Sequence, residues 1–355
     1  MSNTLFTPAT LGKLQLKNRI VMAPMTRSRA TGNVPNALME KYYADRATAG
    51  LIITEGTAPS PNGLGYARIP GMFSDEQVRG WKQVTDAVHA RGGKMFIQLM
   101  HTGRVSHPAN MAAGSKILAP SAVAAPGEMW TDSSGMQPHP VPAAMSEAEI
   151  LSAVAEYANA SKRAIEAGFD GVELHAANGY LIDQFLNTAT NQRTDQWGGS
   201  VENRIRFAVE VARASVAAIG ADRIGMRISP YGAFNGTVSD PKMDAMYLRL
   251  IEELNKLGLV YIHVVDHSSM GAPEVSPELK AKIRANFTGK YILSGGYDAA
   301  RANADLDAQR GDLVAFGRPF ISNPDLVQKL QNGAALTAPD PATFYTPGEK
   351  GYTDY

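Results

Sequence analysis

The chain has 355 residues, of which 44% are hydrophobic and 19% are charged, a composition typical of a globular enzyme with a large buried core. Its 34 basic residues balance 34 acidic ones, so no net charge favours nucleic acid or an anionic membrane, and a small-molecule partner is expected. The absence of cysteine excludes disulfides, thiolate nucleophiles, cysteine-ligated zinc and iron–sulfur clusters, and it favours a cytoplasmic location.

The first residues lack a basic region followed by an apolar one, and no apolar run in the sequence approaches the roughly 20 residues that span a bilayer, so we expect neither an export signal nor a membrane anchor. Residues 1–18 predict a hairpin that closes one end of the fold. Eight short, β-rich apolar runs follow, and most are apolar on both faces, as strands covered on both sides are. These runs are Arg19–Pro24, Gly50–Glu55, Lys94–Leu99, Gly171–His175, Ile224–Ser229, Val260–Val265, Tyr291–Ser294 and Leu313–Phe316.

Segments of helical periodicity alternate with these strands. They are Asn36–Thr48, Asp75–Ala90, Glu147–Ala167, Val201–Ile219, Lys242–Leu257, Pro277–Asn286, Asp298–Gln309 and Asn323–Asn332. Length alone allows two modest domains or one barrel, but this alternation of eight strands and eight helices predicts a single (β/α)8 TIM barrel over residues 1–355.

One long break interrupts the alternation between the third strand and its helix. His101–Met145 is rich in Pro, Gly, Ser and Ala and follows a strand at its carboxyl end. Because that end of a β/α barrel holds the active site, we expect this insertion to form a lid or a pocket wall.

Two glycine-containing segments follow the seventh and eighth strands. Gly295 and Gly296 offer backbone N–H groups, and Gly317 is followed by the fixed charge of Arg318. Barrels recurrently bind phosphate at this place, so the two segments together favour a phosphate site. The alternative is that these glycines only permit tight turns.

Three polar residues follow the fourth strand within six positions. His175 and Asn178 could both donate hydrogen bonds to one substrate oxygen, and Tyr180 offers a proton. The trio suits the polarisation of a carbonyl or nitro group. The alternative is structural, with a strand-capping histidine, a turn asparagine and a core tyrosine.

A metal centre is the rival chemistry for the strand ends. His263, Asp266 and His267 are ligand types, but their spacing at the end of a strand does not present three ligands to one point. The His-x-His pair of many metal-dependent barrels is also absent. We therefore expect no metal.

Ordered segments along the whole chain resemble the old yellow enzyme family of FMN-dependent ene-reductases, from Leu5 to Tyr355. The most specific are AGFDGVELHAANGYLIDQFLN and NQRTDQWGGSVENR in the middle of the chain. The resemblance is also carried by NRIVMAPMTRSRA, AGLIITEGT, FIQLMHTGR, GMRISP, FGRPFISNPDL and the terminal GYTDY.

The resemblance implies an FMN site built from the strand ends. Backbone at Pro24 and Met25 would line the flavin, with the Thr26 hydroxyl near its O4. Gly56 would lie against the ring and Gln98 would bind its pyrimidine edge. The remaining residues serve the anionic parts of the cofactor: Arg227 beside N1 and C2=O, and Gly295, Gly296, Gly317 and Arg318 around the phosphate.

The resemblance also implies the reaction. NADPH or NADH would reduce the flavin, and an activated alkene with a carbonyl or nitro group would then bind in the same pocket. His175 and Asn178 would hydrogen-bond the activating oxygen, and Tyr180 would protonate the α-carbon after hydride reaches the β-carbon. Tyr66 and Tyr345 would form pocket walls.

One position departs from the family pattern. Many members carry tryptophan two residues after the flavin-binding glutamine, where this chain has Met100. A flexible thioether should soften that wall and change stereopreference or tolerance of bulky β-substituents. The asparagine at 178, where some relatives carry histidine, stays within the family's variation.

Two other functions compete with an ene-reductase. A different FMN barrel, such as a dihydroorotate or 2-hydroxy-acid oxidoreductase, would need another base or nucleophile, and a cysteine is impossible. The other alternative is a non-catalytic flavin- or ligand-binding protein, which would not be bleached by NADPH and then recoloured by 2-cyclohexenone.

Overall fold

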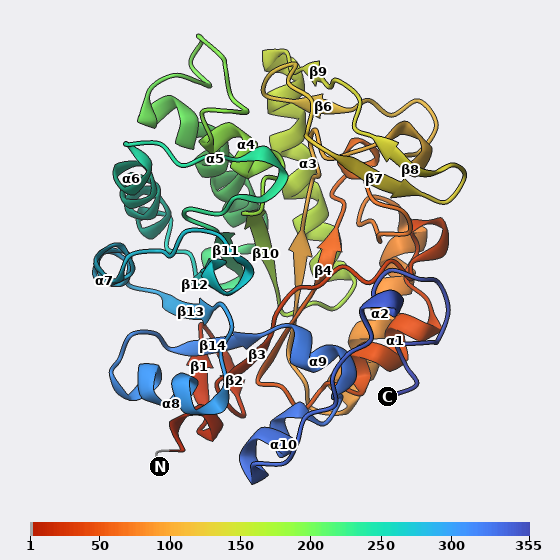
Figure 1. Cartoon of the computed structure of the whole chain (residues 1–355), viewed down its shortest axis with the longest axis vertical. Helices are drawn as coiled ribbons and strands as arrows, with labels where there is room; N and C mark the ends of the chain where they lie inside the picture. Colours follow the sequence, from red (N-terminus) through yellow and green to blue (C-terminus); the bar gives the residue numbers. More distant parts are fainter. Residues whose placement is uncertain (1–2) are drawn as a thin grey trace.

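All eight predicted β-rich runs form strands in the computed structural model, which describes residues 3–355 (Figure 1). Each strand pairs in parallel with the next along the chain, and the last pairs with the first, so the barrel closes and the predicted TIM barrel is confirmed. The strands are β3 (Ile20–Met22), β4 (Leu51–Thr57), β5 (Met95–Leu99), β10 (Gly171–Ala176), β11 (Ile224–Ile228), β12 (Tyr261–Val265), β13 (Lys290–Ser294) and β14 (Leu313–Phe316).

The predicted helices surround the barrel. Ser74 and Ser146 begin two of them with reciprocal capping boxes, which satisfy backbone donors that a helix start leaves free. The helices are α1 (Ala37–Ala44), α2 (Asp75–Ala90), α3 (Glu147–Glu166), α5 (Val201–Ile219), α6 (Met243–Lys256), α7 (Pro277–Asn286), α8 (Ala299–Asp307) and α10 (Leu326–Asn332).

Two short helices depart from the prediction. All six residues of α4 (Leu181–Leu186) are buried, Asp183 and Gln184 included, and the segment is too short to show a repeating apolar face. The other, α9 (Arg318–Ser322), is a five-residue turn that starts directly after Gly317. Both follow strand ends at which candidate site residues lie.

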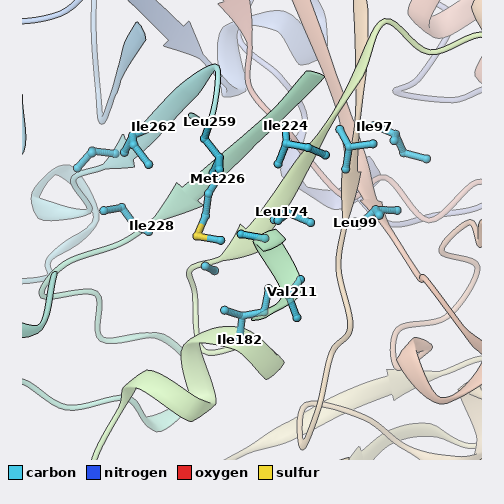
Figure 2. Close-up of a cluster of buried hydrophobic side chains, with 14 of the residues drawn as sticks. Ile97, Leu99, Leu174, Ile182, Val211, Ile224, Met226, Ile228, Leu259 and Ile262 are labelled. Atoms are coloured by element: carbon cyan, nitrogen blue, oxygen red, sulfur yellow. The ribbon is translucent and has the colours of Figure 1, made fainter. Parts of the chain in front are cut away.

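The outward faces of the strands pack against the helices. Figure 2 shows one such cluster, in which side chains of β5, β10, β11 and β12 meet Ile182 of α4 and Val211 of α5. The strand residues labelled there are Ile97, Leu99, Leu174, Ile224, Met226, Ile228 and Ile262. Because side chains alternate across a strand, the residues between them face the barrel interior.

The floor of the barrel is closed by aromatic rings and the N-terminal hairpin. Phe96 and Tyr261 face each other with ring centroids 5.7 Å apart. A Cβ added to Gly171 would lie 2.4 Å from the Phe96 ring, so only glycine leaves room for that ring. Below them, Leu11 and Leu16 of the hairpin formed by β1 (Ala9–Leu11) and β2 (Leu14–Leu16) join the same interior cluster.

The predicted hairpin is therefore present over residues 9–16 and lies at the bottom of Figure 1, whereas residues 1–2 lie outside the described part of the chain. Along residues 3–355, no helix is long and apolar enough to cross a membrane. The cytoplasmic location stays a prediction.

The insertion at 101–145 contains four short strands that the sequence did not predict. They are β6 (Leu118–Ala119), β7 (Glu128–Thr131), β8 (Gly135–Pro138) and β9 (Ala143–Ala144). The antiparallel pair β7–β8 stands above the barrel at the upper right of Figure 1. The insertion thus projects from the carboxyl ends of the strands.

Candidate active site

Strand pleating brings a set of polar side chains into the upper half of the barrel. Two residues above Phe96 lies Gln98, and two residues above Tyr261 lies His263, because inward-facing positions recur with a period of two. Glu173 pairs in register with Gln98, and Arg227 pairs with both His175 and His263. The barrel interior therefore changes from apolar to polar toward the carboxyl ends of its strands.

A cavity of about 450 Å³ opens above these side chains, and we call it the tyrosine cavity because it contains Tyr66, Tyr180 and Tyr345. It brings together residues from most of the strand ends. The other predicted site residues that line it are Pro24, Thr26, Gly56, Gln98, Met100, His175, Asn178 and Arg227.

A second cavity of about 410 Å³ adjoins the first, with which it shares Pro24 and Arg227. We call it the glycine cavity. Its lining includes the remaining predicted residues, Met25, Gly295, Gly296, Gly317 and Arg318. The sixteen predicted site residues therefore all line one of two connected cavities.

The glycine cavity has backbone features that other residues could not supply. Gly295 and Gly296 have φ values of +132° and +63°. A Cβ at Gly295 would lie 2.3 Å from the Asp266 carbonyl oxygen, so the close approach requires glycine. Arg318 is exposed and has no ion pair within residues 3–355, which leaves its charge available to an anion.

Arg227 supplies a buried positive charge where the two cavities meet. Burial lowers its pKa and the nearby Glu173 carboxylate opposes that shift. Its Nε is buried and has no hydrogen-bond partner within the described residues. The arrangement offers a fixed donor and charge to an anionic or electron-rich group in the cavity.

Glu173 organises the polar layer beneath Arg227. One carboxylate oxygen accepts from Gln98 Nε2 at 2.8 Å, and the other lies 2.8 Å from His263 Nδ1 and 3.1 Å from the Tyr261 hydroxyl. Burial alone would raise its pKa, but His263, Arg227 and Gln98 hold the pKa of Glu173 below its usual value. The network therefore holds the Gln98 side-chain amide in place through its Nε2.

His175 is a neutral hydrogen-bond donor. Burial lowers its pKa well below the usual value, and the positive charge of Arg227 lowers it further. Its Nδ1 accepts the Ala177 backbone N–H at 3.3 Å. A neutral imidazole with Nδ1 as acceptor carries its proton on Nε2, so His175 can donate from Nε2.

Asn178 is held at both its backbone and its side chain. Its φ of +61° is left-handed, a conformation that asparagine tolerates better than most residues. The backbone N–H donates to Ser229 Oγ at 2.9 Å and the carbonyl accepts from Asn235 Nδ2 at 2.8 Å. The side-chain Oδ1 lies 2.7 Å from His267 Nε2.

Tyr180 holds its proton firmly. Its hydroxyl lies 3.1 Å from the Tyr66 hydroxyl, and its ring meets the His175 ring edge-on at 5.0 Å. Burial raises the pKa of Tyr180 well above its usual value, and Tyr66 adds to the shift. The phenol is therefore protonated at neutral pH and can act as an acid.

Met100 directly follows β5 and lines the tyrosine cavity. It is 1% exposed, and a Cβ added to Gly56 would lie 2.5 Å from its sulfur. Gly56 thus lets the methionine approach the backbone of β4.

Several cavity residues escaped the sequence analysis. Six come from the insertion, including Trp130 and Met136 of the β7–β8 pair, which are 54% and 52% exposed. Arg68 ties this pair to its surroundings through an ion pair with Asp132 and a 2.8 Å bond to the Tyr345 carbonyl. No local pattern marks these residues, because they lie far apart in the sequence.

The C-terminal segment reaches the cavity because two buried arginines hold it. Arg27 and Arg29 donate to backbone carbonyls of residues 343–351, at distances from 2.6 to 3.3 Å. Burial and the neighbouring Arg27 lower the pKa of Arg29 to about 10, so it stays charged at neutral pH. This anchoring places Tyr345 at the cavity mouth.

The candidate metal ligands are engaged separately. His263 contacts Glu173, Asp266 pairs with Lys280, and His267 contacts Asn178. Residues 3–355 contain no group of three acidic or histidine side chains arranged to hold a metal ion.

Comparison with known proteins gives consistent matches over the whole chain. A family model described as NADH:flavin oxidoreductase / NADH oxidase matches residues 4–337. Chanoclavine-I aldehyde reductase of Penicillium roqueforti is 46% identical, over 99% of this chain and 95% of its own. A "Probable flavin mononucleotide-dependent alkene reductase" of Leishmania infantum is 44% identical, over 99% and 97%. The structure of morphinone reductase in complex with tetrahydroNAD superposes with a TM-score of 0.94 at 46% identity, covering 100% and 97%.

Proposed function

Because the chain belongs to the NADH:flavin oxidoreductase / NADH oxidase family, the family of old yellow enzyme, we propose that it is a NAD(P)H-dependent ene-reductase acting on α,β-unsaturated carbonyl and nitro compounds. The family is FMN-dependent and contains alkene reductases. The observation that carries the proposal is the convergence of two donors, His175 and Asn178, with the Tyr180 hydroxyl in one cavity.

The two cavities fit FMN. The unpartnered Nε of buried Arg227 and the backbone at Pro24 and Met25 would face the isoalloxazine, with Thr26, Gly56 and Gln98 around it. The positive-φ glycines Gly295 and Gly296, with Gly317 and Arg318, would hold the phosphate. Bound FMN supplies hydride chemistry, taking hydride from NADPH or NADH and giving it to the β-carbon of the alkene.

His175 and Asn178 would bind the carbonyl or nitro oxygen that activates the alkene. As hydride reaches the β-carbon, negative charge gathers on this oxygen, so fixed donors stabilise the transition state more than the bound substrate. Neutral His175 donates from Nε2 because its Nδ1 is already occupied. The loss of one such donor typically costs about 10²–10³ in rate.

Tyr180 would complete the addition across the double bond. Its raised pKa keeps a proton on the hydroxyl, which it delivers to the α-carbon on the face opposite the hydride. The net change is one hydride from NAD(P)H and one proton from Tyr180, which recovers its proton from water. Tyr66, hydrogen-bonded to Tyr180, and Tyr345 would form walls of the pocket.

The chemistry of the relatives' named substrates agrees with this site. One relative is named for an aldehyde and another for an alkene. Both names suit a cavity with hydrogen-bond donors for a substrate oxygen and a proton donor for a substrate carbon.

The test begins with the purified protein under anaerobic conditions. It should be yellow, absorb near 450 nm, bleach when NADPH or NADH is added, and recolour when 2-cyclohexenone or a nitroalkene follows. Recolouring separates an ene-reductase from a non-catalytic flavin-binding protein and from other FMN barrels. A bleached protein that stays colourless with every activated alkene would contradict the proposed function.

A further inference from the structure

His267 follows β12 and contacts a site residue 89 positions away. Its Nε2 lies 2.7 Å from Oδ1 of Asn178, and its ring packs edge-on against Phe234 with centroids 4.5 Å apart. Burial and the charge of Arg227 lower the pKa of His267 to about 4, with Asp266 opposing, so the ring is neutral at pH 7. Because an amide oxygen only accepts, the proton of this neutral ring lies on Nε2.

This contact determines which end of the Asn178 amide faces the tyrosine cavity. A carboxamide can turn over by half a rotation and exchange its acceptor for its donor. The Asn178 backbone is already fixed by Ser229 and Asn235. If the amide turned over, Nδ2 could donate to His267 Nε2 only if the ring moved its proton to Nδ1, which has no hydrogen-bond partner within the described residues, and Oδ1 would face a substrate oxygen acceptor to acceptor.

We propose that His267 is a positioning residue that holds the Asn178 carboxamide with Nδ2 toward the tyrosine cavity, so that Asn178 presents a donor to the substrate oxygen. The inference rests on the proposed function, because it assigns this amide to a substrate oxygen. His267 does not line the tyrosine cavity, so it acts on the substrate only through Asn178. It does line the glycine cavity, which makes FMN content a necessary control.

The test measures the dissociation constant of 4-hydroxybenzaldehyde for the FMN-loaded protein, from changes in the flavin absorption spectrum. The oxygen of this phenol stands in for the substrate oxygen. His267→Phe and His267→Leu should each weaken binding about tenfold, because the amide loses its preferred orientation. His267→Gln can donate from its own amide and should restore most of the affinity. FMN content and melting temperature should match the wild type in the variants compared.

A double-mutant cycle with Asn178→Ala separates positioning from a general structural effect. Asn178→Ala should weaken binding by itself, and adding His267→Phe should then change the affinity by less than about twofold. The inference is overturned if His267→Phe weakens binding equally in both backgrounds, or if it leaves wild-type affinity unchanged. In either case, alkene reduction by the wild type would still support the proposed function. If the wild type reduced no activated alkene, the proposed function itself would be contradicted, whatever the binding data show.

Discussion

Glu55 lies at the carboxyl end of β4, one residue before Gly56 of the tyrosine cavity, and its replacement by glutamine tests the electrostatics of this region. The carboxyl group is fully buried and accepts hydrogen bonds from the backbone N–H of Arg27 at 3.3 Å and from the Tyr43 hydroxyl at 3.2 Å. Burial raises the pKa of Glu55 from 4.5 to about 7, because these bonds offset only part of the lost hydration.

The direction of the effect follows from proton binding. Between pH 4.5 and 7 folded Glu55 keeps a proton that the unfolded chain has released, so its contribution to stability falls as pH rises through this window. The difference between the two pKa values corresponds to about 3 kcal/mol between pH 4 and 8. Glu55→Gln keeps an acceptor for Tyr43 and removes the titration, so the variant should gain stability relative to wild type by about that amount over the same window.

Thermal unfolding of the FMN-loaded proteins at pH 5, 6, 7 and 8 measures the effect. For a chain of this length the difference in melting temperature between variant and wild type should rise by roughly 4 °C from low to high pH. Glu76→Gln, which changes an exposed carboxyl group at the start of α2, is the matched control and should show no such trend. If the difference in melting temperature between Glu55→Gln and wild type did not change with pH, a raised pKa of Glu55 would be refuted.

Three further predictions concern the reaction itself. Tyr180→Phe should slow flavin reoxidation by 2-cyclohexenone at least tenfold, while reduction by NADPH stays near the wild-type rate in stopped-flow measurements; an equal loss in both half-reactions would exclude Tyr180 as the proton donor. The double variant His175→Ala/Asn178→Ala should bind phenols at least tenfold more weakly while FMN stays bound. Unchanged affinity for phenols would show that neither side chain binds the substrate oxygen. Met100→Trp should alter the enantiomeric ratio or the tolerance of bulky β-substituents, as measured by chiral chromatography, and an unchanged product profile would show that this wall does not select substrates.

The barrel could be predicted because its signals are local. Each strand is a short apolar run and most of the helices carry a repeating apolar face, so α2, α5 and α7 begin and end at the predicted residues. The six-residue helix α4 was not predicted because so short a segment does not show a repeating apolar face. It missed β7 and β8 because short strands in a Pro- and Gly-rich insertion gain their pairing only from each other.

The position of the candidate site also followed from the sequence, since polar residues at strand ends of a barrel must share one face. Their contacts did not follow. Tyr66 and Tyr180 are 114 residues apart and His267 is 89 residues from Asn178, yet each pair is in hydrogen-bond contact. The sequence presents His267 only as a possible metal ligand, because its neighbours in the chain do not indicate that it contacts Asn178.

The sequence by itself thus determined the eight barrel strands, the eight helices that alternate with them, and the end of the barrel at which His175, Asn178 and Tyr180 would lie. Only the tertiary structure decided which nitrogen of His175 carries a proton and what orients Asn178, because hydrogen bonds between distant loops depend on closure of the barrel. Burial also depends on that closure, and it raises the pKa of Tyr180 and lowers that of His175. Local pattern therefore sets where these groups lie, and barrel closure sets their protonation.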